Sequence, residues 1–436
     1  MTVYDHLWST EETRALFDDR GRTGSWLEII AALATAQAEL GLIPEAAARD
    51  IAAHARIEDL DLEAVAEQTR ATGHSTLGLI RVLQRELGPE GRAWVYHGAT
   101  VQDVSDTWTG LVMQRLLAIA RRDLAEIERS LRELAQRHRG TVMLGRTHGQ
   151  PGLPITFGFK AAVWAAEVSR HRQRVEQAEP RLAVGQLAGA VGTQSAWGEH
   201  GPELERRVMA RLDLGVPDTP WLTARDRIAE FMTLLALITG TLAKIGNEVY
   251  NLQRAEIAEV SEAPSPGVVG SITMPQKRNP ERSEHLGTLA RLVRAAAGLA
   301  LEGLVVEHER DGTPWKAEWD FLPRACAASA VALALGGELV AGLRVDGERM
   351  RANLEAQRGY VLAEPVMLAL AAHVGKARAH ELVHAAALRG QQQGLSLREA
   401  LAAEPAIAEH LDLDDVLRVE RALGAVDALI DRALEP

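Results

Sequence analysis

Cysteine is almost absent from this chain of 436 residues, which holds only Cys326. One thiol cannot form a disulfide within the chain, and it cannot supply the several sulfur ligands of a cysteine-based zinc site. We also predict neither a metal site nor a cofactor. Because Cys326 lies in the apolar stretch 325–337, we expect it to be a small buried core residue.

Positive charge is in deficit. The chain has 48 Lys and Arg residues against 60 Asp and Glu residues, a formal net charge of −12, and no run of basic residues. Proteins bind nucleic acid phosphates through clustered Lys and Arg, so we expect no nucleic acid partner. A small anionic ligand would instead need a local pocket of positive charge.

Long uncharged apolar runs are missing as well. The longest, 231–243 and 325–337, each hold 13 residues, whereas a membrane-spanning helix needs roughly 18–20. The first residues carry acidic side chains and no apolar core, unlike a signal peptide. We therefore expect no membrane association and a cytoplasmic protein.

What the sequence does have is helical periodicity. Apolar residues recur at alternating steps of three and four residues in two long stripes, which are typical of long helices packed in a bundle. A third long helix is expected from about 281 to 308, and no convincing alternating strand pattern is present, so the predicted fold class is all-α. The stripes comprise Ile228, Phe231, Leu235, Ile238, Leu242, Ile245, Val249 and Leu252, and Leu117, Ala120, Leu124, Ile127, Leu131 and Leu134.

Glycine and proline breaks suggest three parts. Short helices are predicted over residues 1–91, a central long-helix bundle domain over 92–343, and a second smaller helical domain over 344–436. A long bundle with a broad apolar seam usually continues into partner subunits, so we expect an oligomer built by bundle packing.

Three polar segments interrupt the apolar stripes: HGATVQDVSDT (97–107), GRTHGQPGLP (145–154) and GSITMPQKRNP (270–280). Each carries hydroxyl, amide, imidazole or ammonium groups and lies next to a predicted long helix. Long helices can bring their ends together at a subunit junction, where such groups could converge on a small ligand. The stretch 264–270 contains two prolines and cannot be regular helix, and we expect it to be a mobile loop that closes over substrate.

The third segment resembles the signature loop of the fumarase/aspartase superfamily, Gly-Ser-x-x-Met-Pro-x-Lys-x-Asn. The other two segments occur in the order and approximate spacing of that family, so the resemblance covers nearly the whole chain. It implies a lyase that removes a proton next to a carboxylate and expels a β-substituent, which releases fumarate or a close analogue. It also implies a small dicarboxylate substrate and a homotetramer with active sites shared between subunits.

The resemblance assigns roles to residues of all three segments. Ser271 falls on the catalytic base, and Lys277 and Asn279 fall on groups that hold the substrate carboxylate and stabilise an aci-carboxylate intermediate. His148 matches a histidine that assists the leaving group or orients the site, and Glu284 matches the carboxylate that pairs with it. The matched substrate-binding positions are Thr100, Gln102, Asp103, Thr147, Asn279, Met274 and His74.

These residue types suit the chemistry. A carbon acid beside an ionised carboxylate is very weak, so a second negative charge gathers on that carboxylate in the transition state. Lys277, Asn279 and backbone N–H groups at helix starts can stabilise this charge. Ser271 becomes a base only when a closed loop excludes water and surrounds its oxygen with donors. A His148–Glu284 pair would fix the imidazole tautomer and raise its basicity.

Local details leave several members of the superfamily open. HGATVQDVSDT and HERDGTPWKAEWDFLP (308–323) resemble the 3-carboxy-cis,cis-muconate cycloisomerases, whereas GRTHGQP and the His74 segment resemble the adenylosuccinate lyases. Where the latter place serines and an arginine for a nucleotide phosphate, this chain has two tryptophans and a glutamate in 313–319, which do not make a phosphate cradle.

We therefore predict C–N bond cleavage in a small, non-nucleotide substituted succinate, with an amine or nitrite leaving group as in nitrosuccinate lyase. The alternatives are a 3-carboxy-cis,cis-muconate cycloisomerase, an adenylosuccinate lyase and, of another class, a catalytically inactive structural homologue. Retention of Ser271, Lys277 and Asn279 argues against the inactive homologue, because a structural role needs none of them.

Overall fold

The computed structural model describes residues 3–264, 267 and 271–435, which divide into two compact units. Unit 1 comprises Met1–Leu124, His171–Ala243 and His285–Leu335, and unit 2 comprises Ala125–Arg170, Lys244–Glu284 and Gly336–Pro436. Each unit therefore draws on three separate stretches of the sequence. The division into parts at residues 91 and 343 stays a prediction.

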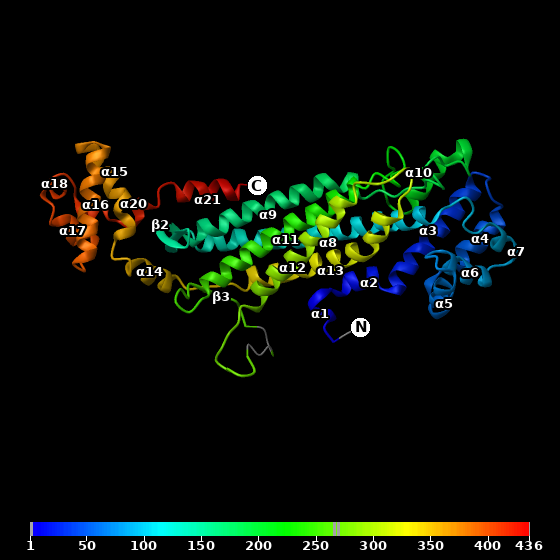
Figure 1. The fold of residues 1–436 in the computed structure, drawn as a ribbon, viewed down its shortest axis with the longest axis horizontal. Coiled ribbons are helices and arrows are strands. Elements are labelled where there is room, and N and C mark those ends of the chain that lie inside the picture. The colour runs from blue at the N-terminus through cyan, green and yellow to red at the C-terminus, as the bar shows by residue number, and fades with distance from the viewer. Residues whose placement is uncertain (1–2, 265–266, 268–270, 436) are drawn as a thin grey trace. The chain divides into compact units, whose positions relative to one another are not determined.

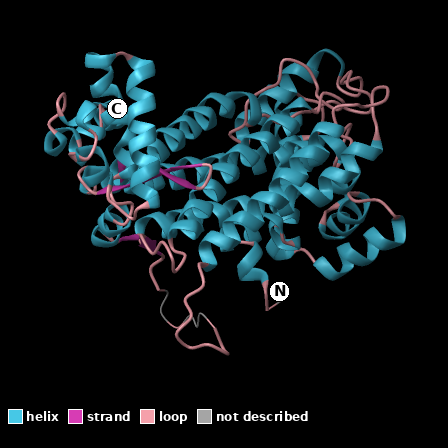
Figure 2. Ribbon diagram, turned by 60° about the vertical axis from the view of Figure 1, so that its left-hand side comes forward, coloured by secondary structure: helices cyan, strands magenta, loops and turns pink. Residues whose placement is uncertain are grey.

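Helices make up most of the described chain, which confirms the predicted all-α fold class (Figure 1). Within each unit, segments of the long helices lie side by side (Figures 1 and 2). The third predicted long helix ends at Glu302 rather than near His308, because Gly303, a poor helix former, follows it. The helices longer than 20 residues are α3 (Asp19–Glu39), α8 (Val101–Arg137), α9 (Phe157–Leu182), α11 (Asp226–Leu252), α12 (Glu281–Glu302) and α13 (Gly312–Ala341).

The two predicted apolar stripes form the buried faces of α11 and α8. Every stripe residue from Ile228 to Leu252 is at most 2% exposed, and every one from Leu117 to Leu134 is at most 4% exposed. Helices α11 and α13 are long and apolar enough to cross a membrane by length and composition alone, but 61% of each apolar window is buried inside the protein. Burial of Cys326 on α13 is confirmed, and it raises the pKa of the thiol.

Shorter helices flank the long ones. In unit 1 they are α1 (Asp5–Trp8), α2 (Glu11–Phe17), α4 (Glu45–His54), η1 (Ile57–Asp59), α5 (Leu62–Thr72), α6 (Leu77–Glu86), α7 (Pro89–Trp94), η2 (Gly198–His200) and α10 (Gly201–Arg211). In unit 2 they are α14 (Gly347–Glu355), η3 (Tyr360–Leu362), α15 (Ala363–Val374), α16 (Lys376–Gln392), α17 (Leu397–Ala402), α18 (Pro405–Ala408), α19 (Leu413–Val416), α20 (Val419–Ala422) and α21 (Val426–Leu434).

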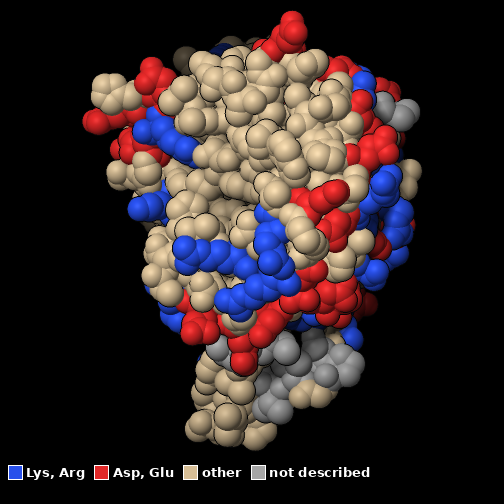
Figure 3. Space-filling view, turned by 90° about the vertical axis from the view of Figure 1, so that its right-hand side faces the viewer, with Lys and Arg blue, Asp and Glu red and all other residues tan. Residues whose placement is uncertain are grey.

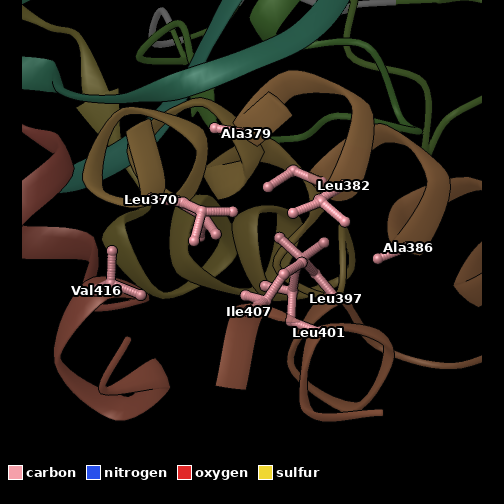
Figure 4. Close-up of a cluster of buried hydrophobic side chains, with 10 residues drawn as sticks. Leu370, Ala379, Leu382, Ala386, Leu397, Leu401, Ile407 and Val416 are labelled. Atoms are coloured by element: carbon pink, nitrogen blue, oxygen red, sulfur yellow. The ribbon is translucent and has the colours of Figure 1, made fainter. Parts of the chain in front are cut away.

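The C-terminal helices have a hydrophobic core of their own. Leu370 of α15, Leu382 of α16 and Leu397 and Leu401 of α17 point toward one another (Figure 4). Ile407 of α18 completes this cluster and is 0% exposed. The cluster explains why such short helices are ordered, because helices of this length draw their stability from packing rather than from propensity.

Two small sheets are the main departure from the predicted secondary structure. Strands β1 (Val142–Thr147) and β2 (Gln150–Thr156) form an antiparallel hairpin, and β3 (Val260–Ser261) pairs with β4 (Arg344–Val345) (Figure 2). The hairpin has a register shift between Leu144 and Arg146. Glycines and prolines within the hairpin break the alternation of apolar and polar residues that identifies a strand, so the pattern missed it.

Basic and acidic side chains are intermixed on the face shown in Figure 3. Blue and red groups lie beside one another around a largely uncharged middle. In unit 1, for example, Arg206 and Arg207 of α10 both donate hydrogen bonds to the carboxylate of Glu203. Exposed pairs of this kind contribute little to stability, each about 0–1 kcal/mol.

A buried ion cluster joins three helices of unit 1. Arg225, directly before α11, is 2% exposed and binds Asp106 of α8 at 2.8 Å and Glu318 of α13. Its Nε lies 2.9 Å from Glu318 Oε1. Burial raises the pKa of Glu318, and the Arg225 charge partly offsets that rise. The guanidinium therefore compensates the negative charge of two buried carboxylates.

Replacing Arg225 with methionine should strongly destabilise the protein. Methionine has a similar length but leaves Asp106 and Glu318 buried without a cation, so the free energy of unfolding should fall by about 3–5 kcal/mol. Urea unfolding at fixed protein concentration measures this free energy of unfolding. The control is Arg20→Met, because the Arg20–Glu58 pair is more than half exposed, and this change should cost less than about 1 kcal/mol. Equal losses would contradict the assigned role of Arg225.

Candidate active site

The first polar segment forms the start of α8 in unit 1, where Asp103 ties the backbone together. Asp103 is 0% exposed and accepts hydrogen bonds from the N–H groups of Thr100 (2.8 Å), Ala188 (2.6 Å) and Gly189 (3.2 Å). Burial nevertheless raises the pKa of Asp103 to about 6. With its carboxylate occupied by protein groups, Asp103 positions the segment, and its binding of substrate stays a prediction.

Arg310 is a functional candidate that the sequence reasoning missed. It precedes α13, and its guanidinium donates from Nε to Gln102 Oε1 at 3.0 Å and from one terminal nitrogen to Thr100 Oγ1 at 2.9 Å. The other terminal nitrogen is buried and has no hydrogen-bond partner among the described protein groups. Gln102 also donates to the carbonyl of Leu222 at 2.9 Å, so both ends of its amide are engaged.

The arrangement leaves a cationic donor beside Thr100. A carboxylate could accept from the unsatisfied nitrogen of Arg310, since charge-assisted contacts of this kind are strong. Arg310 belongs to HERD, the first four residues of the segment 308–323. That segment was notable only for its resemblance to members of the superfamily, and Arg310 itself was not predicted to be functional. Nothing in the sequence spacing predicts that residue 310 reaches residues 100 and 102.

His74 lies in the short connection between α5 and α6 of unit 1. Its Nδ1 accepts hydrogen bonds from the N–H groups of Thr76 (3.3 Å) and Leu77 (3.2 Å), and the side chain is exposed. An acceptor at Nδ1 places the proton of the neutral ring on Nε2, which is left as a donor. The local backbone thus fixes the tautomer of this imidazole.

The second polar segment forms the tip of the β1–β2 hairpin in unit 2. Thr147 pairs with Gln150, and the two residues between them are His148, with φ of 52°, and Gly149, with φ of 75°. Two successive positive φ angles are typical of the turn that joins two-residue hairpins, where asparagine and glycine are favoured. A histidine in this conformation, exposed to solvent, is uncommon and consistent with a functional role.

An ion pair anchors this hairpin. Arg146, two residues before His148, binds Glu259 through two parallel hydrogen bonds of 2.8 and 2.6 Å. Glu259 is 0% exposed and also accepts from Asn353 Nδ2 at 2.8 Å. Bidentate pairing fixes orientation as well as distance, so the imidazole-bearing turn has a rigid base next to β3.

In unit 2, hydrogen bonds join the residues that precede the signature loop to those that follow it. Glu262, just after β3, accepts hydrogen bonds from the backbone of Ser283 (2.9 Å) and of Arg282 (3.2 Å) at the start of α12. Arg282 in turn donates to the carbonyl of Ala263 at 3.0 Å. A carboxylate on the first N–H groups of a helix is a favourable cap. Both ends of the loop are therefore held together.

The catalytic candidates follow on this loop. Ser271 Oγ accepts a hydrogen bond from the N–H of Met274 at 3.0 Å, and Asn279 Nδ2 donates to Glu281 at 3.2 Å. Met274 and Lys277 are exposed, and Glu284 is an exposed residue in the first turn of α12. The loop predicted to be mobile, 264–270, includes 265–266 and 268–270, which lie outside the described residues, so its mobility stays a prediction.

The structure thus places the candidates in two groups. His74, Thr100, Gln102 and Asp103 belong to unit 1, and Thr147, His148, Ser271, Met274, Lys277, Asn279 and Glu284 belong to unit 2. Arg310 adds a cation to the first group. The roles of these residues and the His148–Glu284 pair stay predictions.

Comparison with protein families gives the decisive match. The model described as "Lyase" matches residues 6–294, and that described as "Adenylosuccinate lyase C-terminus" matches 359–433. The chain belongs to the fumarase/aspartase superfamily of lyases. Its recognition from the signature loop is therefore confirmed.

Individual members of the superfamily are similar along nearly the whole chain. N-acetyl-S-(2-succino)cysteine lyase of Dickeya dadantii is 40% identical over 407 residues, 93% of this chain and 89% of the relative. 3-Carboxy-cis,cis-muconate cycloisomerase of Pseudomonas aeruginosa is 38% identical and covers 99% of this chain and 95% of its own. The crystal structure of fumarate lyase from Mesorhizobium sp. BNC1 has a TM-score of 0.91 and 35% identity, covering 98% of each chain.

These relatives differ in the reactions that their names describe, so the comparisons establish the superfamily and not the bond that is cleaved. The predicted C–N cleavage is not confirmed, because one similar protein is named as a lyase of a succinated cysteine and another as a cycloisomerase.

Proposed function

We propose that the protein eliminates the substituent of a small, non-nucleotide 2-substituted succinate and releases fumarate. The observation that carries the proposal is the signature loop, which presents the hydroxyl of Ser271, the ammonium of Lys277 and the amide of Asn279 on one short segment. Glu262 and Ala263, which precede the loop, are hydrogen-bonded to Arg282 and Ser283, which follow it. A base and two charge-stabilising donors are what a β-elimination next to a carboxylate requires.

The preferred leaving group is a thiolate. The sequence by itself favours an amine or nitrite as the leaving group. However, the 40% identical relative from Dickeya dadantii is named for a substrate in which succinate is bound to sulfur. Support for a non-nucleotide substrate comes from the start of α13. There, Trp315 and Trp319 pack edge to face at 4.7 Å between ring centres, and Glu318 is already paired with Arg225. Such groups do not form a phosphate site.

In the proposed reaction, the deprotonated Ser271 oxygen takes a proton from the substrate carbon next to a carboxylate. The electron pair of the broken C–H bond moves onto this carboxylate, where Lys277 and Asn279 stabilise the second negative charge. The pair then returns to form the carbon–carbon double bond of fumarate while the C–S bond breaks. The sulfur leaves with the electrons of that bond, and Ser271 keeps the proton.

We propose that the site is shared between copies of the chain, and the exposure of several candidate residues in the single chain supports this. A homotetramer with such sites follows from the superfamily resemblance. Neighbouring copies would bury His148, Lys277 and Glu284, and this loss of solvent would strengthen their electrostatic contacts with the substrate.

A substrate panel tests the proposed function. The protein is incubated separately with N-acetyl-S-(2-succino)cysteine, an N-alkylated aspartate, adenylosuccinate and 3-carboxy-cis,cis-muconate, and fumarate is measured by its ultraviolet absorbance. We expect fumarate from the succinated thiol and none from adenylosuccinate. Faster fumarate release from the N-alkylated aspartate would favour C–N cleavage over C–S cleavage. Lactone formation from the muconate without any fumarate release would overturn the proposal.

His148 should matter less for a sulfur leaving group than for nitrogen. A thiol has a pKa near 8.5 and can leave as its anion, whereas an amine must be protonated as the bond breaks. His148→Asn keeps the favoured turn residue and should leave Tm unchanged. It should lower kcat by less than about tenfold with the succinated thiol and by about 10²-fold or more with an N-alkylated aspartate. Equal losses with both substrates would contradict an acid role.

A further inference from the structure

Unit 1 contains a cavity of about 400 Å³ next to the candidate substrate-binding residues. Ser75, one residue after His74, lines it, and so do Ser105 and Asp106, which follow Asp103 on α8. A volume of this size falls within the range of about 300–1,000 Å³ that small-molecule sites occupy. The cavity is therefore lined by sequence neighbours of His74 and Asp103 and has room for an organic ligand.

Aromatic rings and arginines give the cavity its chemical character. Its walls include Trp26, Trp108, Trp315, Trp319, Arg22 and Arg70. Acidic groups are present too, but Asp106 and Glu318 are tied to Arg225, and the third lining carboxylate, Asp19, interacts electrostatically with Arg22. Such a lining suits an apolar ligand that bears a negative charge.

Two buried hydrogen-bond donors on α3 indicate which kind of group carries the negative charge of the ligand. Arg22 and Trp26 are one helical turn apart, so they lie on the same face of the helix. The Arg22 Nε and the Trp26 indole nitrogen are both buried without a hydrogen-bond partner among the described protein groups. Both atoms can only donate, so the group that satisfies them must bring acceptor oxygens.

A contact with Trp108 holds the guanidinium of Arg22 in position. Its guanidinium carbon lies 4.6 Å from the centre of the Trp108 ring, a cation–π contact that fixes the charged plane against an aromatic wall. Stacking of this kind leaves the edge of the guanidinium available for a planar acceptor, and a carboxylate matches that edge with two oxygens. A methyl ester of the same ligand would lack the charge.

We propose that this cavity is the subsite for the departing substituent of the substrate, and that the substituent carries its own carboxylate, which Arg22 binds. The inference rests on the function proposed above and names the substrate class more closely. The tryptophans contact the apolar part of the substituent, while the signature loop and the Thr100–Arg310 pair are left for the succinate half. An N-acylated, sulfur-linked amino acid meets these requirements.

Binding of a substituent analogue tests the inference without any turnover. The probes are N-acetyl-S-methyl-L-cysteine and its uncharged methyl ester, titrated calorimetrically into the full-length protein. We expect the wild-type protein to bind the acid about tenfold or more tightly than the ester, because charged hydrogen bonds contribute that much. In Arg22→Gln the two probes should bind equally, and the ester should bind the variant as well as it binds the wild-type protein.

The ester serves as the control for damage to the fold, since a collapsed cavity would lose both probes. Equal binding of acid and ester to the wild-type protein, or a preference for the acid that survives in Arg22→Gln, would overturn the inference, as would failure of both probes to bind. Its failure is distinguishable from that of the proposed function. The probes cannot be eliminated, so their binding is independent of whether fumarate is released from a succinated substrate.

Discussion

Replacing Ser271 with alanine should lower kcat about 10³-fold or more while substrate binding changes little. A positioned general base contributes about 10²–10⁴-fold, and the resemblance to the superfamily signature gives that role to Ser271. The substrate carboxylates would still meet Lys277 and Asn279. Initial rates of fumarate formation give kcat, and calorimetric titration with the substrate gives its Kd.

The matched control is Thr273→Ala. Thr273 carries a hydroxyl two positions further along the same loop and is exposed, but it occupies a variable position of the signature. Its loss should change kcat by less than about threefold, as expected for a group outside the transition state. If both variants kept wild-type kcat, Ser271 would not be the base, and the assignment of the reaction to this loop would fail.

Replacing Lys277 with glutamine should lower kcat/KM by about 10²–10³-fold, because removing one preorganised donor from a developing charge costs this much. The substitution keeps an uncharged polar side chain but removes the ammonium donor and its positive charge. Most of the loss should appear in kcat, because the second charge on the substrate carboxylate exists only in the transition state. Steady-state kinetics with the succinated thiol separates the two constants.

Arg278→Gln is the control for a general field effect. Arg278 is the next residue and is also exposed, so the two substitutions remove equal charge from neighbouring positions. We expect Arg278→Gln to change kcat/KM by less than about threefold, since exposed charges are screened by solvent and salt. Equal losses in the two variants would show that the loop attracts an anionic substrate without stabilising its transition state.

The long helices were predictable because one physical rule determines them. Residues that must be buried on a helix recur every three or four positions, and all members of the predicted stripes on α8 and α11 are buried. The β1–β2 hairpin was not predicted, because Gly145, Pro151 and Pro154 obscure the alternation of its strands. The turn residues His148 and Gly149 became informative only through their positive φ angles.

The site was predictable in its signature and not in its supporting contacts. Ser271, Lys277 and Asn279 share one short segment, and the resemblance of that segment to the superfamily signature is what singles them out. The supporting contacts join residues that are 86 to 210 positions apart along the chain, namely those of Arg310, Arg225 and Arg22 with their partners. Only folding brings such residues together. A pattern in one sequence carries no information about such pairings.

The central claim is that one site is assembled from residues of different copies of the chain, and mixing two inactive variants tests it most directly. Ser271→Ala and His148→Asn are each assayed alone, then unfolded together in equal amounts and refolded, with an N-alkylated aspartate as substrate. If the two residues of a site come from different copies, about a quarter of the sites in random hybrids are intact, so about a quarter of wild-type activity should return. If the mixture stays as inactive as its components although hybrid oligomers form, Ser271 and His148 of a site belong to one chain, and the proposal that different copies supply them is contradicted.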